Sequence, residues 1–307
     1  MKKLKKSLIR FLANTRLFQY IARKTGYAPY KLHVPPGHFY SPIPDLKEVD
    51  IYADRVFDQD RRTLPGIDLN EQQQVALLEN LSRYYPELPF PDTKQEDRRY
   101  YYGNDLYCQS DAICLYAMMR HFQPKRIIEA GSGFSSAVML DTNDLFFNSS
   151  IRIELIEPYP DRLYSLLTPK DRTTVTVHEK KLQDMPLDYF RTLEANDILF
   201  IDSSHVSRVA GEVNYYMFEI LPLLKPGVLI HIHDIFNGFE YPKSWIYHGF
   251  SWSEAYLLRA FLQYNKSFEI ILFNTFLSHF HRDFFQEKMP LCLKNEGGSI
   301  WLRKTDN

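Results

Sequence analysis

Residues 127–136 read IIEAGSGFSS, an apolar run followed directly by two glycines that one serine separates. Glycine is scarce in this chain, with 12 among 307 residues, so such a pair is informative. Without a Cβ, Gly131 and Gly133 let the backbone turn tightly and come close to a ligand. The stretch therefore predicts a strand that turns into a helix, whose first N–H groups face the turn. A tight turn without a ligand is the alternative interpretation.

Short apolar runs alternate with helical segments on both sides of this turn. Residues 198–201 are apolar throughout, which is typical of a parallel strand covered on both faces. The alternation predicts a doubly wound α/β domain. We expect strands over residues 126–130, 152–157, 173–177, 197–202, 228–233, 268–273 and 299–302, and a helix over 253–264.

Residues 1–104 differ in character, and we expect them to form an appendage to an α/β domain over residues 105–307. Residues 25–66 carry prolines that exclude long helices. Asn70, with Gln73 three residues later, predicts a capping box at the start of a helix over residues 70–84. A second helix is expected over residues 109–121. The prolines are Pro29, Pro35, Pro36, Pro42, Pro44 and Pro65.

The composition is that of a folded domain, with 45% hydrophobic and 24% charged residues. It excludes a disordered chain, and no apolar run reaches the ~18 residues of a membrane span. The three cysteines show no CxxC spacing, which indicates a reducing cytoplasm without a disulfide framework. Residues 1–44 contain nine Lys or Arg and no acid, which leaves 28 basic and 38 acidic residues elsewhere. That acidic remainder argues against a nucleic-acid partner.

Residues 1–24 combine this basic charge with apolar residues at helical intervals. A basic amphipathic helix can lie on an anionic membrane surface, here the inner one. The alternative is a helix packed on the protein's own body or on a second subunit, which would make a homo-oligomer.

Two acids indicate the kind of ligand. Glu129 precedes Gly131 by two residues, and Glu157 ends the second expected strand, 26 residues after that glycine. A carboxylate at this strand end can accept both hydroxyls of a ribose. Ser136 stands where a dinucleotide-binding fingerprint has glycine, and an acid before the turn suits a cation better than a pyrophosphate. The pattern favours S-adenosylmethionine (SAM) over NAD.

The segments EAGSGFSS, IELIEP, DILFIDSSH and KPGVLIHIHDIF together resemble the class I SAM-dependent methyltransferases. They are most similar to bacterial proteins of methyltransferase domain family 24, which are related to small-molecule and sugar O-methyltransferases. The resemblance runs over roughly residues 104–274, and YSPIPDL at residues 40–46 also resembles such proteins. It implies a Rossmann-like seven-stranded sheet of order 3-2-1-4-5-7-6, with the last strand antiparallel.

The resemblance also implies a cofactor site. The glycine turn would line the methionine and sugar parts of SAM, and Glu157 would hold the ribose. Ser135 stands where many members carry a third glycine. The adenine contact falls at Leu182, Gln183 or Asp184. The implied cofactor-binding residues are Glu129, Gly131, Ser132, Gly133, Ser135, Glu157, Asp184 and Asp202.

A second group of polar residues follows the fourth and fifth expected strands. Because the carboxyl ends of parallel strands meet at one edge, we expect Asp202, His205, His233 and Asp234 to converge there. His205 or His233 would act as general base, with an Asp fixing its tautomer. Alternatively, Asp202 and Asp234 would hold Mg²⁺, although Ile235 stands where similar enzymes place Asp or Asn. Helix capping by Asp202 and Ser203 is the purely structural alternative.

Eight aromatic residues lie between residues 236 and 256. They predict a wall for the acceptor, or else a hydrophobic cover over the sheet end. The sequence as a whole predicts a SAM-dependent O-methyltransferase acting on a hydroxyl of a small molecule or glycan. The alternatives are a non-catalytic nucleotide- or SAM-binding scaffold and an NAD-dependent oxidoreductase.

Overall fold

The computed structural model describes residue 20 and residues 33–306. The basic helix predicted over residues 1–24 therefore lies outside the described residues, apart from residue 20. The chain divides into two compact units, Met1–Tyr52 and Ala53–Asn307. In the first unit, α3 (Leu46–Ile51) begins where the Asp45 side chain accepts a hydrogen bond from the Lys47 N–H at 3.0 Å.

The boundary between the units lies well before the expected one at residue 104. The reason is that residues 64–102 contribute to the hydrophobic core of the second unit. Leu78, Leu81 and Tyr100 are fully buried in the same cluster as the strands of the sheet. Residues 53–104 are thus part of the α/β unit.

The second unit is built on one seven-stranded sheet of order β3-β2-β1-β4-β5-β7-β6, as predicted. β7 is antiparallel to both of its neighbours, and the other pairs are parallel. The third strand begins later than predicted, because Asp171–Thr174 form the short helix α9. The strands are β1 (Arg126–Ala130), β2 (Arg152–Ile156), β3 (Thr176–His178), β4 (Ile198–Ile201), β5 (Leu229–His233), β6 (Phe268–Phe273) and β7 (Ser299–Lys304).

Helices flank this sheet, and the predicted helices near residues 70, 109 and 253 are all present. The capping box predicted at Asn70 is wrong: its side chain makes no cap hydrogen bond and instead donates to the Ile270 carbonyl of β6 at 3.3 Å. None of the described helices is both long enough and apolar enough to cross a membrane. The helices are α4 (Ala53–Val56), α5 (Glu71–Ser82), α6 (Gln109–Phe122), α7 (Phe134–Phe146), α8 (Asp161–Leu166), α9 (Asp171–Thr174), α10 (Leu187–Phe190), α11 (Glu212–Tyr215), α12 (Lys243–Tyr247), α13 (Glu254–Leu262), α14 (Asn274–Phe280) and α15 (Arg282–Lys288).

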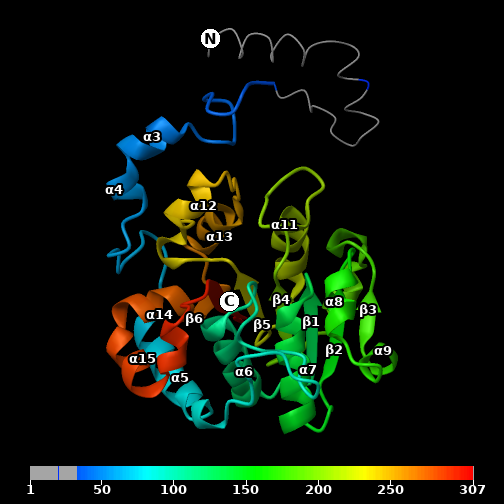
Figure 1. Cartoon of the computed structure of the whole chain (residues 1–307). Helices are drawn as coiled ribbons and strands as arrows, with labels where there is room; N and C mark the ends of the chain where they lie inside the picture. Colours follow the sequence, from blue (N-terminus) through cyan, green and yellow to red (C-terminus); the bar gives the residue numbers. More distant parts are fainter. Residues whose placement is uncertain (1–19, 21–32, 307) are drawn as a thin grey trace, which may run out of the picture. The chain divides into compact units, whose positions relative to one another are not determined.

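The sheet runs through the middle of this unit (Figure 1). α8 and α9 lie beside the β2–β3 end, and α5, α14 and α15 lie at the β6 end. The register fixes the functional edge. Ala130 pairs with Ile156 of β2 and with Ile201 of β4, so these three strands end at one level. The residues that follow them are Gly131, Glu157 and Asp202, which are thereby neighbours.

Gly131 is required by the neighbouring strand. Its φ is +86°, and a Cβ there would lie 1.5 Å from the carbonyl oxygen of Asp202. The Asp202 N–H donates to the Ala130 carbonyl at 2.8 Å, so β1 and β4 are still paired at this point. The main chains approach so closely that only glycine fits. The neighbouring backbone therefore requires glycine at this position whether or not a ligand binds there.

We predict that Gly131→Ala destabilises the fold by more than about 3 kcal/mol, since backbone strain and a main-chain collision add. Gly249→Ala is the matched control. Its φ is +91° and a Cβ there would meet nothing within 4 Å, so only the left-handed backbone cost of roughly 1–2 kcal/mol applies. Thermal unfolding of both variants measures the difference, and equal losses would contradict the collision.

Candidate functional site

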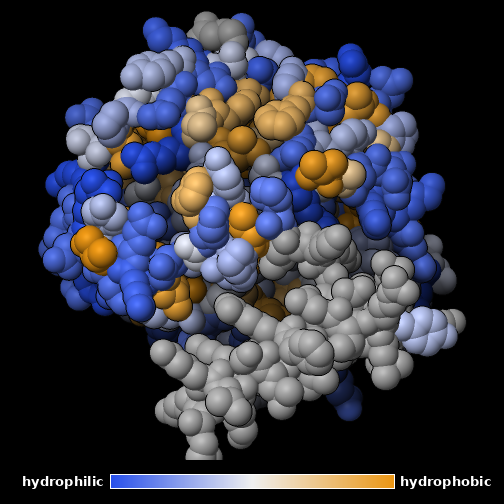
Figure 2. Space-filling view, turned by 90° about the horizontal axis from the view of Figure 1, so that it is seen from above, coloured by the Kyte–Doolittle hydropathy of each residue, from blue (hydrophilic) through white to orange (hydrophobic). Residues whose placement is uncertain are grey.

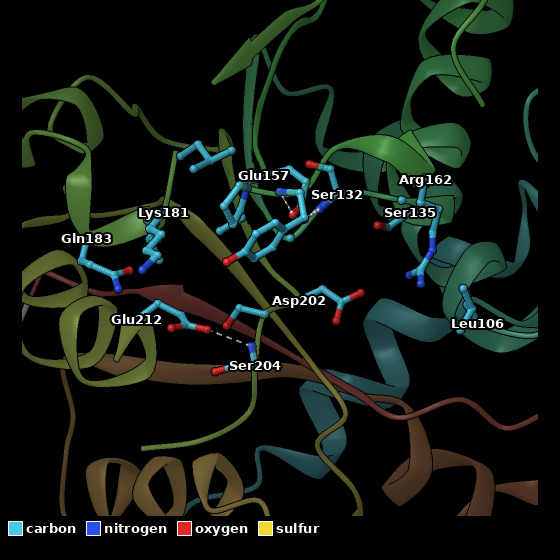
Figure 3. A pocket seen from close by; sticks show the side chains of 18 of the residues that line it. Leu106, Ser132, Ser135, Glu157, Arg162, Lys181, Gln183, Asp202, Ser204 and Glu212 are labelled. Atoms are coloured by element: carbon cyan, nitrogen blue, oxygen red, sulfur yellow. Dashed lines mark hydrogen bonds between the residues drawn. The ribbon is translucent and has the colours of Figure 1, made fainter. Parts of the chain in front are cut away.

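One cavity of about 620 Å³ opens at the carboxyl edge of β1, β2 and β4, within the size range of small-molecule sites. Seen from above, the described part of the surface is largely hydrophilic, with separate hydrophobic patches (Figure 2). The residues that line the cavity follow five different elements, and the central ones are drawn in Figure 3. They include Leu106, Tyr107, Gly131, Ser132, Gly133, Ser135, Glu157, Arg162, Lys181, Leu182, Gln183, Asp202, Ser203, Ser204, Arg208, Val209 and Glu212.

The amides of the glycine turn are already committed to protein acceptors. The Gly131 N–H donates to the Ile156 carbonyl at 3.0 Å, and the Ser132 N–H donates to the Glu157 carboxylate at 3.1 Å. The Gly133 N–H donates to Ser136 Oγ at 3.1 Å. An anion such as a pyrophosphate would need these donors. The turn is therefore poorly suited to a phosphate, and Glu157 places a negative charge beside it.

Glu157 lies against the cavity, as Figure 3 shows. Its Oε2 accepts from Ser132, and its Oε1 accepts from the Tyr159 N–H at 2.8 Å. Two backbone donors therefore hold the carboxylate in place. Each carboxylate oxygen can accept more than one hydrogen bond, so both keep capacity toward the cavity.

Glu129 does not line the cavity. It is fully buried beneath the turn, where it accepts hydrogen bonds from Ser135 Oγ at 2.5 Å and from Ser136 Oγ. Burial raises the pKa of Glu129 to about 8, against the opposing effect of these two hydroxyls. In the fold it holds the start of α7, and its contact with a cofactor stays a prediction.

The third wall of the cavity comes from the segment after β3. Lys181, Leu182 and Gln183 line the cavity, whereas Asp184 is exposed outside it. Of the three positions predicted for the adenine contact, Leu182 and Gln183 line the cavity and Asp184 does not. The short helix η2 (Leu182–Asp184) turns its first two side chains inward and its third outward.

Buried polar atoms without partners gather at this cavity. Among the described residues, Ser203 Oγ, Ser204 Oγ and Gln183 Oε1 are buried and make no hydrogen bond. All three belong to residues that line the cavity. Buried polar groups that lack partners are rare and costly, so their grouping indicates a polar ligand. Sequence reasoning did not assign these serines to a ligand, because unsatisfied atoms become visible only in three dimensions.

Charged side chains stand at both ends of the cavity. Asp202 lies between them, with Arg162 on the side of Ser135 and Lys181 on the side of Gln183 (Figure 3). Burial alone would raise the pKa of Asp202, but the charges of His233 and His205 and the contact with His205 lower it overall. Asp202 is thus an ionised group on the cavity wall, with 29% of its side chain exposed. Arg162 was missed in the sequence because no motif marks it.

The structure brings the four predicted catalytic residues together behind that wall. His205 Nε2 lies 3.6 Å from Asp202 Oδ1 and 3.4 Å from Asp234 Oδ2, and His233 Nε2 lies 3.7 Å from Asp234 Oδ1. Of the four, only Asp202 lines the cavity. His205 and His233 are both more than nine-tenths buried.

His205 is surrounded by carboxylates. Besides the two Asp side chains, its Nδ1 lies 2.8 Å from Glu254 Oε2, at the start of α13. Burial would lower the pKa of His205, but its interactions with Asp202 and Glu254 and the charge of Asp234 raise it well above the ordinary value. A raised pKa favours the protonated ring, which makes His205 less suited to be a general base, and its role as base stays a prediction.

The two histidines of β5 differ from each other. His231 stacks on Phe200 with ring centroids 3.9 Å apart, and burial holds the pKa of His231 well below its ordinary value. His233 keeps an unpartnered Nδ1 and packs against Tyr107, with ring centroids 5.2 Å apart. Burial would lower the pKa of His233, but nearby acids, chiefly Asp202, raise it. Both nitrogens of His231 also lack partners, so the features that distinguish His233 are its contact with Tyr107 and the acids near it.

The Mg²⁺ site suggested for Asp202 and Asp234 does not fit this arrangement. Both carboxylates face His205 Nε2, which stands in the position between them. Across the described part of the chain, no three His, Cys, Asp or Glu side chains are placed to hold a metal ion. In this arrangement Asp202 Oδ1 and Asp234 Oδ2 lie closest to an imidazole nitrogen, and Mg²⁺ at this position stays a prediction.

The aromatic segment after β5 covers this cluster and does not line the cavity. Trp252 packs on His205 with ring centroids 4.4 Å apart. Trp245 stands edge-on to Trp252 at 5.2 Å, and Phe250 does so at 4.9 Å. The rings pack chiefly on each other, which favours the cover over the acceptor wall that the sequence also allowed.

Comparison with known proteins agrees with this arrangement. A family model described as a methyltransferase domain, family 24, matches residues 128–235, which run from β1 to the end of β5. The matched span contains the glycine turn, Glu157 and Asp202. This chain belongs to that family. It is a class I SAM-dependent methyltransferase, with the strand order expected of that fold.

The methyltransferase is 39% identical over 170 residues to an uncharacterised protein of Archaeoglobus fulgidus, a match that spans 53% of this chain and 75% of the relative. It is also similar to two solved structures at 15% identity. The O-methyltransferase TomG from Streptomyces achromogenes, in complex with SAM, has a TM-score of 0.44 over 84% of this chain and 96% of its own. The SAH-bound methyltransferase PaMTH1 of Podospora anserina has a TM-score of 0.41 over 87% and 99%.

The buried Glu129 of the methyltransferase predicts a pH dependence of its stability. Its carboxyl ionises near 4.5 in the unfolded chain and, in the fold, at a pKa of about 8. Between these values the folded state keeps a proton that the unfolded state loses. Stability therefore falls as the pH rises through this window, by up to about 1.4 kcal/mol per pH unit.

Glu129→Gln cannot titrate, so this contribution disappears in the variant. We expect the variant to gain stability relative to the wild type as the pH rises from about 5 to about 8. Urea unfolding at a series of pH values measures the difference. Parallel pH curves for the two proteins would show that Glu129 is ionised in the fold.

Proposed function

We propose that SAM binds in the cavity at the carboxyl edge and that the enzyme methylates a hydroxyl of a small molecule or glycan. The observation that carries the cofactor assignment is the hydrogen bonding of the glycine turn. Its amides at Gly131, Ser132 and Gly133 bond to protein atoms. A ligand without phosphate does not need these amides, whereas the pyrophosphate of a dinucleotide would lack its main hydrogen-bond donors.

The charges and unpartnered atoms of the cavity suit the parts of SAM. Glu157 would accept the ribose hydroxyls, and Gln183 with Leu182 would face the adenine. At the other end, Asp202 would attract the methionine ammonium and Arg162 its carboxylate. Ser203 and Ser204 would gain the hydrogen bonds that they lack. Each of these assignments pairs a ligand group with a side chain on the cavity wall.

When bound, SAM supplies a methyl group that is already activated for displacement by an acceptor oxygen. The protein must then exclude water, align the acceptor and take its proton. We infer that His233 takes that proton, because its Nδ1 has no partner and Tyr107, which lines the cavity, packs against its ring. Asp234, 3.7 Å from His233 Nε2, would stabilise the imidazolium that results.

Cofactor binding is tested by calorimetry with SAM, S-adenosylhomocysteine and NADH. We expect the first two to bind and NADH not to bind. Glu157→Gln should weaken SAM binding by about tenfold or more, since a charged acceptor of hydroxyls is lost. Gly133→Val should weaken SAM binding, because a Cβ there would make only an ordinary contact, 3.5 Å from Arg162 Cδ, so the added side chain would fit the fold but fill part of the cavity.

Gly249→Ala, far from this turn in sequence, serves as the control and should bind SAM as the wild type does. Absence of SAM binding by the folded wild type would refute the proposal. Binding without transfer of labelled methyl to any acceptor in an extract would identify a non-catalytic scaffold.

If His233 is the general base, replacing it should lower the rate of methyl transfer without changing the affinity for SAM. His233→Asn should slow methyl transfer by roughly 10²–10⁴-fold and leave the SAM affinity within about twofold. In the wild type the rate should rise with pH as the ring loses its proton, above its ordinary range because the pKa of His233 is raised. Transfer of labelled methyl from SAM measures both effects. An unchanged rate in the folded variant would assign the proton to another group.

A further inference from the structure

We propose that Arg208, together with Lys181, binds an acid group of the methyl acceptor. The acceptor is then a hydroxylated small molecule that also carries a carboxylate or a phosphate. This inference rests on the proposed function and names the substrate class of the same cavity. The two residues determine specificity, and they take no part in moving the proton.

Three cationic side chains line the cavity and lack a counter-ion. They belong to Arg162, Lys181 and Arg208. Among the described residues, no carboxylate forms an ion pair with any of them. The buried Arg99, by contrast, has its guanidinium 2.8 Å from the Asp141 carboxylate. Cations that line a cavity without a partner attract an anionic ligand.

SAM accounts for only one of these cations. Its single anionic group is the methionine carboxylate, which we assign to Arg162 on the side of Ser135. Lys181 lies at the opposite end, on the side of Gln183, where the adenosine part would lie (Figure 3). Adenosine carries no negative charge, so the cofactor leaves both Lys181 and Arg208 without a counter-ion.

The segment that follows β4 carries Arg208 to the cavity. The Gln183 side chain donates to the Ala210 carbonyl at 3.0 Å, which places the tip of the segment beside η2. The Ser207 N–H donates to Ser253 Oγ at 2.9 Å, so the segment is also tied to the N-cap residue of α13. Arg208 itself is exposed and lines the cavity. Its guanidinium can therefore meet a molecule that enters from solvent, and its planar set of donors suits a carboxylate or a phosphate.

The charges of the cavity favour one anionic group on the acceptor. The carboxylates that line it are those of Glu157, Asp202 and Glu212, and they equal the three cations in number. The formal charge of the lining is therefore balanced before SAM binds. SAM brings an ammonium, a sulfonium and a carboxylate, which together add one positive charge. An acceptor with one negative charge restores the balance, and the attraction raises its concentration at the cavity.

Exposed apolar side chains border the same opening. Tyr159 is 78% exposed and Val209, next to Arg208, is 97% exposed, yet both line the cavity. Apolar groups at the edge of a polar cavity favour contact with the carbon skeleton of a ligand. The segment after β4 thus offers a cation and an apolar surface together, which suits an acid built on a carbon ring or chain.

The preference for an anion is tested with D-glucuronate, D-glucose 6-phosphate and neutral D-glucose as probes. Saturation-transfer NMR measures their binding to the protein loaded with S-adenosylhomocysteine. We expect at least one of the two anions to bind about tenfold or more tightly than glucose, because it forms a charge-assisted pair. Tighter binding of glucuronate would identify a carboxylate on the acceptor, and tighter binding of the 6-phosphate would identify a phosphate.

Arg208→Gln should remove this preference and leave the affinity for S-adenosylhomocysteine within about twofold, and Lys181→Gln should weaken the preference. Arg83→Gln is the matched control, because it removes the same charge from an exposed residue at the end of α5 that does not line the cavity. This control should keep the preference. No preference for either anion in the wild type, or a preference that Arg208→Gln leaves unchanged, would overturn the proposal.

A second experiment separates this proposal from the proposed function. The enzyme transfers labelled methyl from SAM to the small molecules of a cell extract, and the products are passed over an anion-exchange column. Methylation of a hydroxyl leaves the acid group intact, so the column should retain the labelled product, and Arg208→Gln should lower its yield. A labelled product that passes through unretained would refute the anionic acceptor and still support methyl transfer, whereas absence of SAM binding would refute the proposed function.

Discussion

The close approach of two main chains at Gly131 is the constraint on which the site depends. β1 and β4 stay paired to their last residues, and the turn after β1 then passes so near Asp202 that no Cβ fits. This contact fixes the height at which Asp202 leaves the sheet and the direction in which residues 132–136 enter α7. The cavity is the space left beside that contact, so its shape follows from backbone packing before any ligand is considered.

The acids around this edge carry different charges because their neighbours differ. Glu129 lies under the turn with two hydroxyls and no cation, and its raised pKa favours the neutral carboxyl. Asp202 has His205 and His233 near it, and its lowered pKa keeps it ionised. A carboxyl group thus supplies a structural hydrogen-bond acceptor at one position and a charged cavity wall at another. Burial alone would have made both neutral.

The fold could be predicted because apolar runs of strand length indicate strands that are buried on both faces of a sheet. β1 and β6 match their predicted ranges for this reason. β3 did not match, because its β-branched residues begin inside α9, where threonines 173 and 174 bond to the Lys170 carbonyl. Asn70 has the composition of a cap, but its backbone is left-handed and its amide serves β6, a contact 200 residues away.

The site could be predicted only as far as strand order brings residues together. Asp202, His205, His233 and Asp234 converge because β4 and β5 are adjacent. Their roles depend on Glu254, which follows His205 by 49 residues and belongs to a helix that no motif links to the strand ends. The inward turn of Gln183 and the outward turn of Asp184 likewise depend on one short helix. The strand order predicts which of these residues are neighbours, whereas the protonation of His205 depends also on Glu254.

The aromatic segment after β5 influences the protonation of this cluster through packing. Packed over His205, Trp252 and its neighbours keep water from the ion cluster, and an ion pair is stronger where water is excluded. The cover therefore strengthens the hold of the carboxylates on the imidazole, and with it the fixed position of Asp202. Aromatic residues that neither line the cavity nor transfer a proton would then help to keep Asp202 ionised where the cofactor would bind.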